Sequence, residues 1–499
     1  MEQRLNAPPR VGRALAVGLR GLTPQLFVVT VDLRPGDGFH FPDLPESRAR
    51  EERVILGSAL SSAVRGYALT VRLDPAPTRA TQLSIGLAVV GAVLAAVGRV
   101  PSSALESTVL VGELSLTGGA RRTRGIYAAL SGLGALGIGR AVVPLAALND
   151  VMDACNQLEV TTVESVNDVE AALTSPNPVR GAEPVPPADP AIDVSDIRGM
   201  ESAKWALEIA AAGDHNLLLF GPPGSGATML ARRLPTIMGP LSAEEAREVH
   251  AIYSIAGLSD RGVTGPAFRA PHHTVSAAGL VGGGSPVRPG EVTLAHRGCL
   301  FLEDFPELAK GTAAALFSAL KKGRSDLSVA GERVSFPARP LLAIGASPCP
   351  GRCAASETKC SCPASAVVKH LEWLREILID VADIFVRLEP VSISGLSSRA
   401  TGQPSAVVRE RVARARSRRL QRDAAAATTK GAGPSEAVLE RLKSVRARSR
   451  RPPSTHAECL KVLRLARTIA DLDGVDDVSA LHIREAIDVA FLYATSLHR

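Results

Sequence analysis

The sequence has 499 residues, of which 45% are hydrophobic and 21% charged, a balance typical of a globular rather than a disordered protein. A chain of this length exceeds one ordinary domain, so we expect about two to four domains. The formal net charge of +7 favours an anionic partner only weakly, because modest positive charge bears on solubility as well as on binding. Seven cysteines are too few for a disulfide-rich secreted domain.

The most apolar stretch is LSIGLAVVGAVLAAVG, residues 83–98. It is shorter than the roughly 20 residues that a membrane-spanning helix needs, so we expect a buried helix. The first residues contain no apolar core of signal-peptide length followed by a small-residue cleavage site. These features predict a cytoplasmic protein without a membrane partner.

Composition divides the chain into four segments. Residues 1–175 alternate β-branched stretches with Ala/Leu-rich ones, which predicts a compact mixed α/β domain. Residues 176–192 are rich in proline and are expected to form a semi-rigid linker. Residues 193–390 alternate short apolar strands with helical patterns, as in a parallel sheet with helices on its faces. Residues 391–499 are helical and strongly basic.

A glycine-rich loop follows the predicted strand NLLLF and precedes a helical pattern, which is the context of a phosphate-binding loop. The backbone N–H groups of such a loop and the helix N-terminus form a positive cradle. The residues expected to contact ATP or ADP are Gly221, Pro222, Pro223, Gly224, Ser225, Gly226, Ala227, Thr228 and Met229. The Thr228 hydroxyl would hold Mg²⁺. The alternative is a glycine-rich turn without a ligand.

The loop departs from the pattern G-x-x-x-x-G-K-[ST] at one position, where Ala227 replaces lysine. An ammonium about 4 Å from phosphate charge is worth roughly 4 kcal/mol at an effective dielectric of about 20, before desolvation. Even half of this corresponds to roughly one to two orders of magnitude in affinity. Phosphoryl transfer should suffer more, because charge on the γ-phosphate and its leaving oxygen must be neutralised. Ala227 therefore predicts weak binding and little hydrolysis.

The apolar segment CLFL ends in two adjacent carboxylates, Glu303 and Asp304. Such a pair is typical of the metal and water element of a P-loop ATPase, so both are candidate catalytic residues and Glu303 a candidate Mg²⁺ ligand beside Thr228. The usual order places the shorter aspartate first and the longer glutamate second. Asp304 is one methylene short of the reach that orients water, and a misplacement of about 1 Å can cost roughly a hundredfold in rate. The alternative is a pair of acids facing solvent.

Four stretches together resemble ComM/YifB-type, magnesium-chelatase-like AAA+ proteins. Residues 216–237 contain the phosphate loop, residues 268–308 contain FRAPHHT and the paired carboxylates, and residues 465–474 read LARTIADLDG. Residues 110–126 (LVGELSLTGGARRTRGI) are similar to the Lon-protease-like domain of that family. The resemblance extends over essentially the whole chain.

The resemblance implies an α/β fold: an AAA+ P-loop core with a parallel sheet and helices on both faces, a helical C-terminal lid, and a preceding α+β Lon-protease-like (S5-like) domain. It also implies assembly into a hexameric ring. The best-described activity of the family is ATP-driven DNA branch migration during natural transformation. No serine of the N-terminal region has a convincing nucleophile context, and Tyr127 stands about where a Lon-like lysine would fall, so we do not expect proteolysis.

Several positions depart from the family pattern. The sensor asparagine of an N-P-C-P-C-G motif corresponds to Ser347. The arginine of an L-L-D-R-I-D stretch, which acts on a neighbouring subunit's nucleotide, corresponds to Val381, although Asp380 and Asp383 remain. These groups stabilise transition-state charge.

A second sensor arginine belongs before the last long helix, where this chain has His456 or Ala457. Arg450 or Arg451 could substitute for it. Together with Ala227, these replacements indicate relaxed selection for hydrolysis. The pair His272 and His273 matches a family motif without metal-ligand spacing, which favours a structural or ring-contact role.

Four cysteines form the pattern C-x₃-C-x₆-C-x-C: Cys349, Cys353, Cys360 and Cys362. Four thiolates in a short loop suit tetrahedral Zn²⁺. A comparable knuckle occurs in the family, with its second cysteine where this chain has Gly351. The alternative is a set of reduced, buried cysteines without metal.

A predicted helix, VVRERVARARSRRLQRD, presents arginines around most of its circumference: Arg409, Arg411, Arg414, Arg416, Arg418, Arg419 and Arg422. It is expected to be either a solvated lid helix or a binding site for the DNA backbone, which would make affinity fall steeply with salt. Only 3% of residues are aromatic, so base stacking should contribute little.

The sequence predicts a ring subunit with a nucleotide site, impaired in ATP hydrolysis, that acts as a DNA-associated or regulatory pseudo-ATPase. Its partners in the ring would be copies of itself or an intact paralogue. The first alternative is an active ATP-dependent DNA translocase of the branch-migration type, in which Glu303 and Asp304 exchange roles. The second is a paralogue without function.

Overall fold

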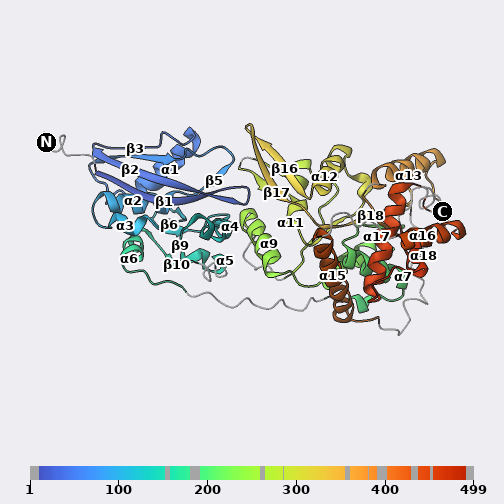
Figure 1. Cartoon of the computed structure of the whole chain (residues 1–499). Coiled ribbons are helices and arrows are strands. Elements are labelled where there is room, and N and C mark those ends of the chain that lie inside the picture. The colour runs from blue at the N-terminus through green and yellow to red at the C-terminus, as the bar shows by residue number, and fades with distance from the viewer. Residues whose placement is uncertain are drawn as a thin grey trace.

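The computed structural model describes residues 10–151, 158–179, 192–258, 265–284, 286–353, 360–379, 381–389, 402–428, 436–449, 453 and 455–490. An N-terminal α/β unit lies at one end of the molecule and a second α/β unit with additional helices at the other (Figure 1). Most of the predicted linker lies outside the described residues.

The N-terminal unit is built on an eight-stranded mixed sheet with the order β10-β9-β6-β1-β2-β4-β3, in which β5 also pairs with β1. Its strands are β1 (Arg10–Arg20), β2 (Thr23–Pro35), β3 (Phe39–His40), β4 (Tyr67–Asp74), β5 (Thr81–Leu83), β6 (Thr108–Leu110), β9 (Arg140–Pro144) and β10 (Glu159–Val163). Its helices are α1 (Glu46–Ala59), α2 (Gly86–Ala96), α3 (Ser102–Leu105), α4 (Ile126–Ser131), α5 (Leu148–Val151) and α6 (Val169–Thr174). A small hairpin joins β7 (Glu113–Leu114) to β8 (Ala120–Arg121).

The apolar stretch of the sequence forms α2, a buried helix, as predicted. It packs directly on β1 at Gly12. A Cβ at this position would lie only 1.9 Å from the carbonyl oxygen of Ala92, so the absence of a side chain allows the close approach. Within the described part of the chain, no helix is both long enough and apolar enough to cross a membrane.

The second unit contains a five-stranded parallel sheet with the order β12-β15-β18-β11-β19. Its strands are β11 (Leu217–Phe220), β12 (Phe268–Arg269), β15 (Cys299–Leu302), β18 (Leu341–Ala346) and β19 (Ile384–Arg387). Its helices are α7 (Glu201–Gly213), α8 (Ala227–Ile237), α9 (Ala243–Ala256), α10 (Ala277–Val281), α11 (Glu291–Leu294), α12 (Lys310–Lys322) and α13 (Ala364–Leu378). Two hairpins join β13 (Gly282–Gly283) to β14 (Arg288–Pro289) and β16 (Arg324–Val329) to β17 (Glu332–Pro337).

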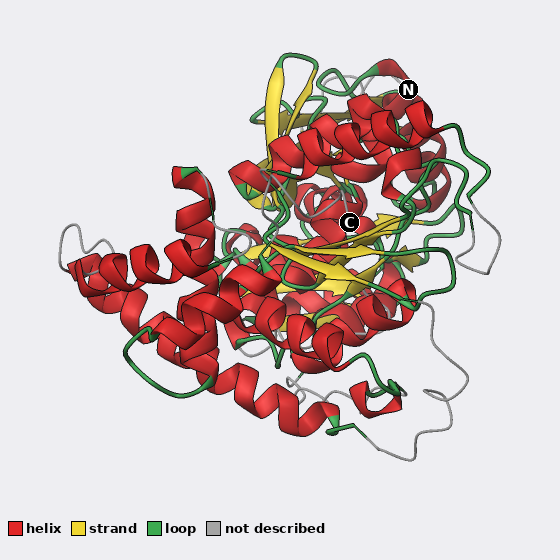
Figure 2. Cartoon of the chain, turned by 90° about the vertical axis from the view of Figure 1, so that its right-hand side faces the viewer, coloured by secondary structure: helices red, strands yellow, loops and turns green. Residues whose placement is uncertain are grey.

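Both faces of this sheet are covered by helices (Figure 2). Leu217 and Leu219 of β11 belong to one hydrophobic cluster, with α7 and α8. Leu218 and Phe220, which alternate with them, belong to another, with α12 and α13. A parallel sheet buried on both faces explains why its strands are short runs of apolar residues. This mixed α/β arrangement is consistent with a P-loop AAA+ core.

Four helices follow: α15 (Ser405–Thr428), α16 (Glu436–Arg448), α17 (His456–Leu472) and α18 (Ala480–Val489). Buried residues of all four share the hydrophobic cluster of α7 and α8. The predicted basic helix is therefore attached to the core of the second unit (Figure 1).

The two units meet at α9 and the β16–β17 hairpin, whose apolar side chains share a cluster with residues of the N-terminal sheet. The Tyr127 ring stacks on His250 of α9, with ring centroids 3.8 Å apart. The Tyr127 backbone N–H also donates to Ser254 Oγ at 3.1 Å. Tyr127, which stands about where a Lon-like lysine would fall, is a buried contact between the units.

Candidate functional site

The glycine-rich loop connects the carboxyl end of β11 to the first turn of α8. Gly224 and Gly226 have φ values of +80° and +95°, a region that residues with a Cβ rarely adopt. A Cβ at Gly224 would meet no atom within 4 Å, so the backbone there faces open space. This geometry gives the exposed backbone cradle that a phosphate requires.

The loop forms one wall of a pocket of about 340 Å³. The pocket is lined by Leu219, Gly221, Pro222, Pro223, Gly224, Ser225, Gly226, Ala227, Thr228, Met229, Glu303, Asp304, Gly345, Ala346, Ser347 and Arg352. The carboxyl ends of β11, β15 and β18 thus meet here, as they do at the ligand sites of parallel α/β sheets. The pocket brings together the nine predicted loop residues and both predicted carboxylates.

The two carboxylates at the end of β15 have different partners. The Thr228 hydroxyl donates to Glu303 Oε1 at 2.5 Å, so these two candidate Mg²⁺ ligands lie in contact. Asp304 has a left-handed backbone, with φ of 51°, and its Oδ2 lies 2.7 Å from Nη1 of Arg352. The carboxylate that would have to orient water is therefore engaged in an ion pair.

Arg352 is a charged lining residue of this pocket that the sequence analysis did not identify. It lies in the cysteine-rich loop after β18, 48 residues beyond Asp304 (352 − 304). Its side chain is 44% exposed, whereas that of Asp304 is 20% exposed. The sequence feature that could have identified Arg352 is its position between two of the four spaced cysteines, Cys349 and Cys353.

The other described residues that the family resemblance linked to ATP hydrolysis carry no positive charge. Ser347 is buried and its hydroxyl donates to the carbonyl of Cys349 at 3.0 Å. Val381 contributes its carbonyl oxygen to the side chain of Asn216. Asp383 pairs with Arg464 at 3.0 Å. Asp380 lies outside the described residues.

The candidates for the second sensor arginine are described only in part. His456 and Ala457 form the first turn of α17, while Arg450 and Arg451 lie outside the described residues. The rings of His272 and His273 lie 4.0 Å apart.

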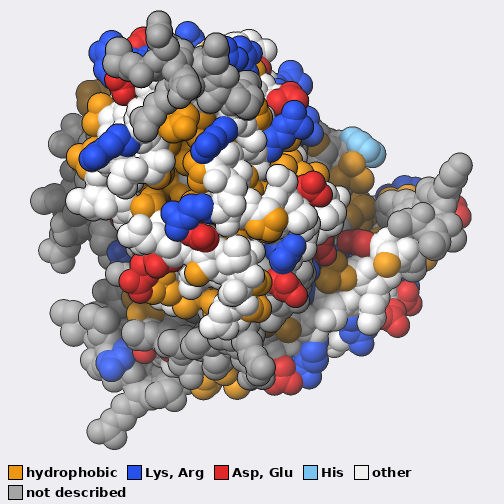
Figure 3. Space-filling view, turned by 90° about the vertical axis from the view of Figure 1, so that its left-hand side faces the viewer, with side chains coloured by type: hydrophobic (Ala, Val, Ile, Leu, Met, Phe, Trp, Pro, Cys, Tyr) orange, Lys and Arg blue, Asp and Glu red, His pale blue; other side chains and the backbone are white. Residues whose placement is uncertain are grey.

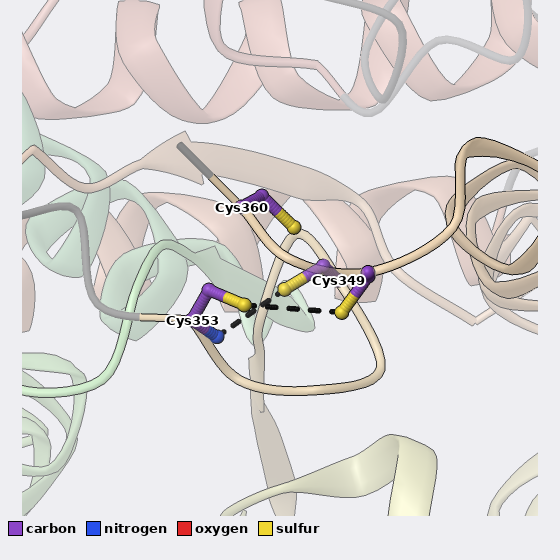
Figure 4. Close-up of side chains that lie close together, drawn as sticks. Cys349, Cys353 and Cys360 are labelled. Atoms are coloured by element: carbon purple, nitrogen blue, oxygen red, sulfur yellow. Dashed lines mark hydrogen bonds between the residues drawn. The ribbon is translucent and has the colours of Figure 1, made fainter. Parts of the chain in front are cut away.

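The four cysteines converge in the loop that carries Arg352, and Figure 4 shows the side chains of Cys349, Cys353 and Cys360 close together. Their sulfur atoms all lie within 4.8 Å of one another, and the sulfurs of Cys353 and Cys362 are 3.8 Å apart. A tetrahedral zinc site with Zn–S bonds of about 2.3 Å has sulfur–sulfur separations of about 3.8 Å. A Cβ at Gly351 would lie 2.6 Å from Cys362 Sγ, so this glycine allows the sulfur to approach. The thiols fit a tetrahedral metal ion.

The thiols of the cluster differ in acidity. Hydrogen bonding from the Ser361 backbone is the main cause that lowers the pKa of Cys353 to about 6. Burial raises the pKa of Cys349 to about 12. Cys353 is therefore ready to bind a metal as a thiolate. At Cys349 the metal itself would have to displace the proton.

Three family models match the chain. Residues 193–396 match the model described as magnesium chelatase, subunit ChlI. Residues 402–489 match the C-terminal model of that subunit, and residues 29–147 match the model described as subunit ChlI of Mg-chelatase. The matches include the pocket and the cysteine cluster.

Relatives match over nearly the whole length. The chain is 31% identical over 496 residues to the protein YifB of Escherichia coli, covering 96% of each chain. It is 31% identical over 506 residues to the competence protein ComM of Haemophilus influenzae, covering 94% of this chain and 95% of the relative. The chain belongs to the ComM/YifB-type, magnesium-chelatase-like family. An uncharacterized protein of Mycobacterium tuberculosis is 36% identical over 423 residues, covering 83% of each chain.

Most of the arginines of α15 in this family member pair with acidic residues of the same chain. Arg411 makes two hydrogen bonds of 2.7 Å to the buried Glu208. Arg416 and Arg419 both pair with Asp214. The helix is thus neither a fully solvated surface nor a free basic face.

Two further pairs involve the same helix. Arg422 makes two hydrogen bonds of 2.7 Å to Asp471, and Arg418 pairs with Asp476 at 2.9 Å. In contrast, Arg446 and Arg448 in the last turn of α16 are exposed.

A larger cavity, of about 810 Å³, lies in the N-terminal unit of this family member and extends to the β13–β14 hairpin. Its walls carry Arg48, Glu52 and Arg122, among other polar groups. Burial is the main cause that raises the pKa of Glu52 to about 7, assisted by Glu113 and Glu51 and opposed by Arg48. On the end of this unit seen in Figure 3, basic side chains alternate with acidic and apolar ones.

Proposed function

We propose that this chain is a nucleotide-binding ring subunit of the ComM/YifB-like family that binds ATP or ADP weakly with Mg²⁺, hydrolyses ATP poorly, and acts as a regulatory or DNA-associated partner. Its ring would be hexameric and formed with copies of itself or with an intact paralogue. The observation that carries the proposal is Ala227 in the wall of the phosphate pocket, at the position of the lysine.

The chemistry of phosphoryl transfer supports the impairment. Charge that develops on the γ-phosphate needs fixed positive groups, and the attacking water needs a free acceptor. Ala227 and Val381 carry no charge, and Asp304 is paired with Arg352. Backbone N–H groups of the loop, together with Thr228 and Glu303 for Mg²⁺, would still hold a nucleotide. Binding without efficient turnover follows from this combination.

The DNA-associated part of the proposal rests on the exposed basic groups of α16 more than on α15. The α15 arginines named above would have to leave their acidic partners before they contact phosphate. Arg446 and Arg448 are better placed because their side chains are exposed, and phosphate contacts of this kind predict a strong loss of affinity with salt.

An active ATP-dependent DNA translocase is the second candidate. One observation favours it: Thr228 and Glu303 lie in contact, so Glu303 would serve the metal in place of the usual aspartate. Asp304 would then have to leave Arg352 to orient water.

Steady-state ATP hydrolysis, measured with and without DNA beside an Ala227→Lys variant, distinguishes the two. We expect wild-type turnover far below about one per second, the low end of ordinary enzyme rates, and tighter nucleotide binding by the variant. Wild-type turnover at or above that rate would reject the impaired subunit in favour of the motor. Absence of nucleotide binding at millimolar ATP would reject both nucleotide-dependent roles.

A further inference from the structure

We propose that Arg352 supplies, from within the same chain, the positive charge that the phosphate loop lacks at Ala227, and that the four-cysteine cluster holds Arg352 in this place. The inference rests on the proposed nucleotide site and adds a residue and a means of control to it. The ligand class is a nucleoside di- or triphosphate.

The first argument is position. Arg352 and Ala227 line the same pocket, together with the cradle glycines and Thr228. The loop that carries Arg352 follows β18, which neighbours β11 in the sheet. A guanidinium in this wall is a second possible source of fixed positive charge for a phosphate bound on the loop.

The second argument is chemistry. Arg352 is held by one carboxylate, Asp304, at 2.7 Å through Nη1. A guanidinium has five N–H donors, so one carboxylate contact leaves donors for a phosphate oxygen. Its side chain is 44% exposed, which leaves it accessible to a ligand that enters the pocket. The ion pair with Asp304 would thus orient Arg352 toward the phosphates.

The third argument is the backbone. Arg352 has a left-handed φ of 50°, which a non-glycine residue adopts at a cost and keeps only where its surroundings impose it. Its N–H donates to the Cys349 carbonyl at 3.2 Å, and the next N–H, of Cys353, donates to Cys349 Sγ at 3.3 Å. Gly351 lies against Cys362 Sγ on the other side. The residues on both sides of Arg352 therefore contact sulfur atoms of the cluster.

These contacts link metal binding to the pocket. A zinc ion held by the four thiols would fix the segment from Cys349 to Cys353 and with it the direction of Arg352. Without the metal, this segment keeps the hydrogen bonds to Cys349 but loses the tether of the metal. Nucleotide affinity would then depend on the state of a cluster that does not itself touch the nucleotide.

The decisive experiment is a double-mutant cycle on nucleotide affinity, with the dissociation constant of ADP and Mg²⁺ measured by calorimetry on the full chain. We expect Arg352→Ala to weaken binding about ten- to a hundredfold, the range of a charge-assisted phosphate contact. In an Ala227→Lys background the same substitution should cost about threefold or less, because the restored lysine supplies the charge. Arg414→Ala, an exposed arginine on α15, is the matched control and should leave the constant unchanged.

Each outcome decides a different statement. If the wild type does not bind ADP at millimolar concentration, the nucleotide site itself is rejected, and this inference with it. If the wild type binds and Arg352→Ala binds equally well, only the role of Arg352 is rejected. An equal loss in both backgrounds would show that Arg352 acts independently of the missing lysine. That result would overturn the proposal that Arg352 takes the place of the lysine.

The cluster is tested by Cys362→Ser, a change at the thiol that lies against Gly351. We expect this variant to lose zinc, measured by mass spectrometry, and to weaken ADP binding by a factor close to that of Arg352→Ala. Combined with Arg352→Ala it should add little further loss. Unchanged ADP affinity in a zinc-free, folded Cys362→Ser protein would show that the cluster does not govern nucleotide binding. The double-mutant cycle described above would still decide whether Arg352 contacts the nucleotide.

Discussion

Thr228 and Glu303 are separated by 75 residues in the sequence, yet the threonine hydroxyl lies 2.5 Å from Glu303 Oε1. The contact joins the first turn of α8 to the end of β15. Both groups are oxygen ligands of the kind that Mg²⁺ prefers, and both line the phosphate pocket. This pair is the observation that most favours the proposed metal-dependent nucleotide site.

Thr228→Ala should weaken ADP binding about tenfold in the presence of Mg²⁺ and have little effect when the metal is chelated. The reason is that the hydroxyl acts through the metal, and a lost charge-assisted contact costs about 1.4 kcal/mol or more. Calorimetric titrations with and without Mg²⁺ measure the difference. Thr228→Ser keeps the hydroxyl and is the control. An equal loss under both conditions would mean that the threonine supports the loop and not the metal.

The isolated protein should contain about one zinc per chain, because four convergent thiols satisfy a tetrahedral site. Elemental analysis by mass spectrometry measures the content directly. Cys360→Ser should reduce it strongly, whereas Cys459→Ser, on α17 outside the cluster, should leave it unchanged. Four thiols that react freely with a thiol reagent in the folded protein would contradict a bound metal.

The loop and its flanking elements could be predicted because the signal is local. The short apolar strand, the glycines and the helical pattern are continuous in sequence, and they form β11, the loop and α8 in that order. The paired carboxylates were also predictable, since they end a strand that belongs to the same parallel sheet.

The charge balance of the site could not be predicted in the same way. The Asp304–Arg352 pair depends on two residues with left-handed backbones, which neither aspartate nor arginine signals in a sequence. Periodicity showed that arginines surround α15, but the partner of Arg411 lies 203 residues away. Long-range partners of this kind are set by packing, which composition does not encode.

Arg411→Ala should destabilise the second unit by about 3–5 kcal/mol, because it leaves the carboxylate of Glu208, whose side chain is 5% exposed, buried without its partner. Chemical unfolding followed by circular dichroism measures the change. Arg414→Ala, with a side chain that is 68% exposed, should change stability by less than about 0.5 kcal/mol. A double substitution of Arg411 to Met and Glu208 to Leu should recover most of the loss, since apolar pairs can replace a buried ion pair. Equal effects of Arg411→Ala and Arg414→Ala would show that the α15 pairs contribute little.

Glu52 predicts a pH dependence of stability in the N-terminal unit. Its pKa in the folded chain is raised from 4.5 to about 7, chiefly by burial, so the folded state holds a proton that the unfolded state has lost at pH 6. The contribution of Glu52 to the free energy of unfolding is constant below about pH 4.5, falls between about pH 4.5 and 7, and is constant again at a lower value above about pH 7. The unit is therefore more stable below about pH 4.5 with respect to this group and loses up to about 3 kcal/mol as the pH rises through 7.

Glu52→Gln should remove this decline, because glutamine keeps the shape of the protonated carboxyl and cannot ionise. Unfolding of the full chain in urea at pH 5.5 and pH 8 measures the difference between the two proteins. The exposed neighbour Glu51 provides the matched control, and Glu51→Gln should keep most of the wild-type slope. If the decline between these pH values is as steep in Glu52→Gln as in the wild type, the titrating group lies elsewhere, and the cavity wall does not hold a protonated Glu52.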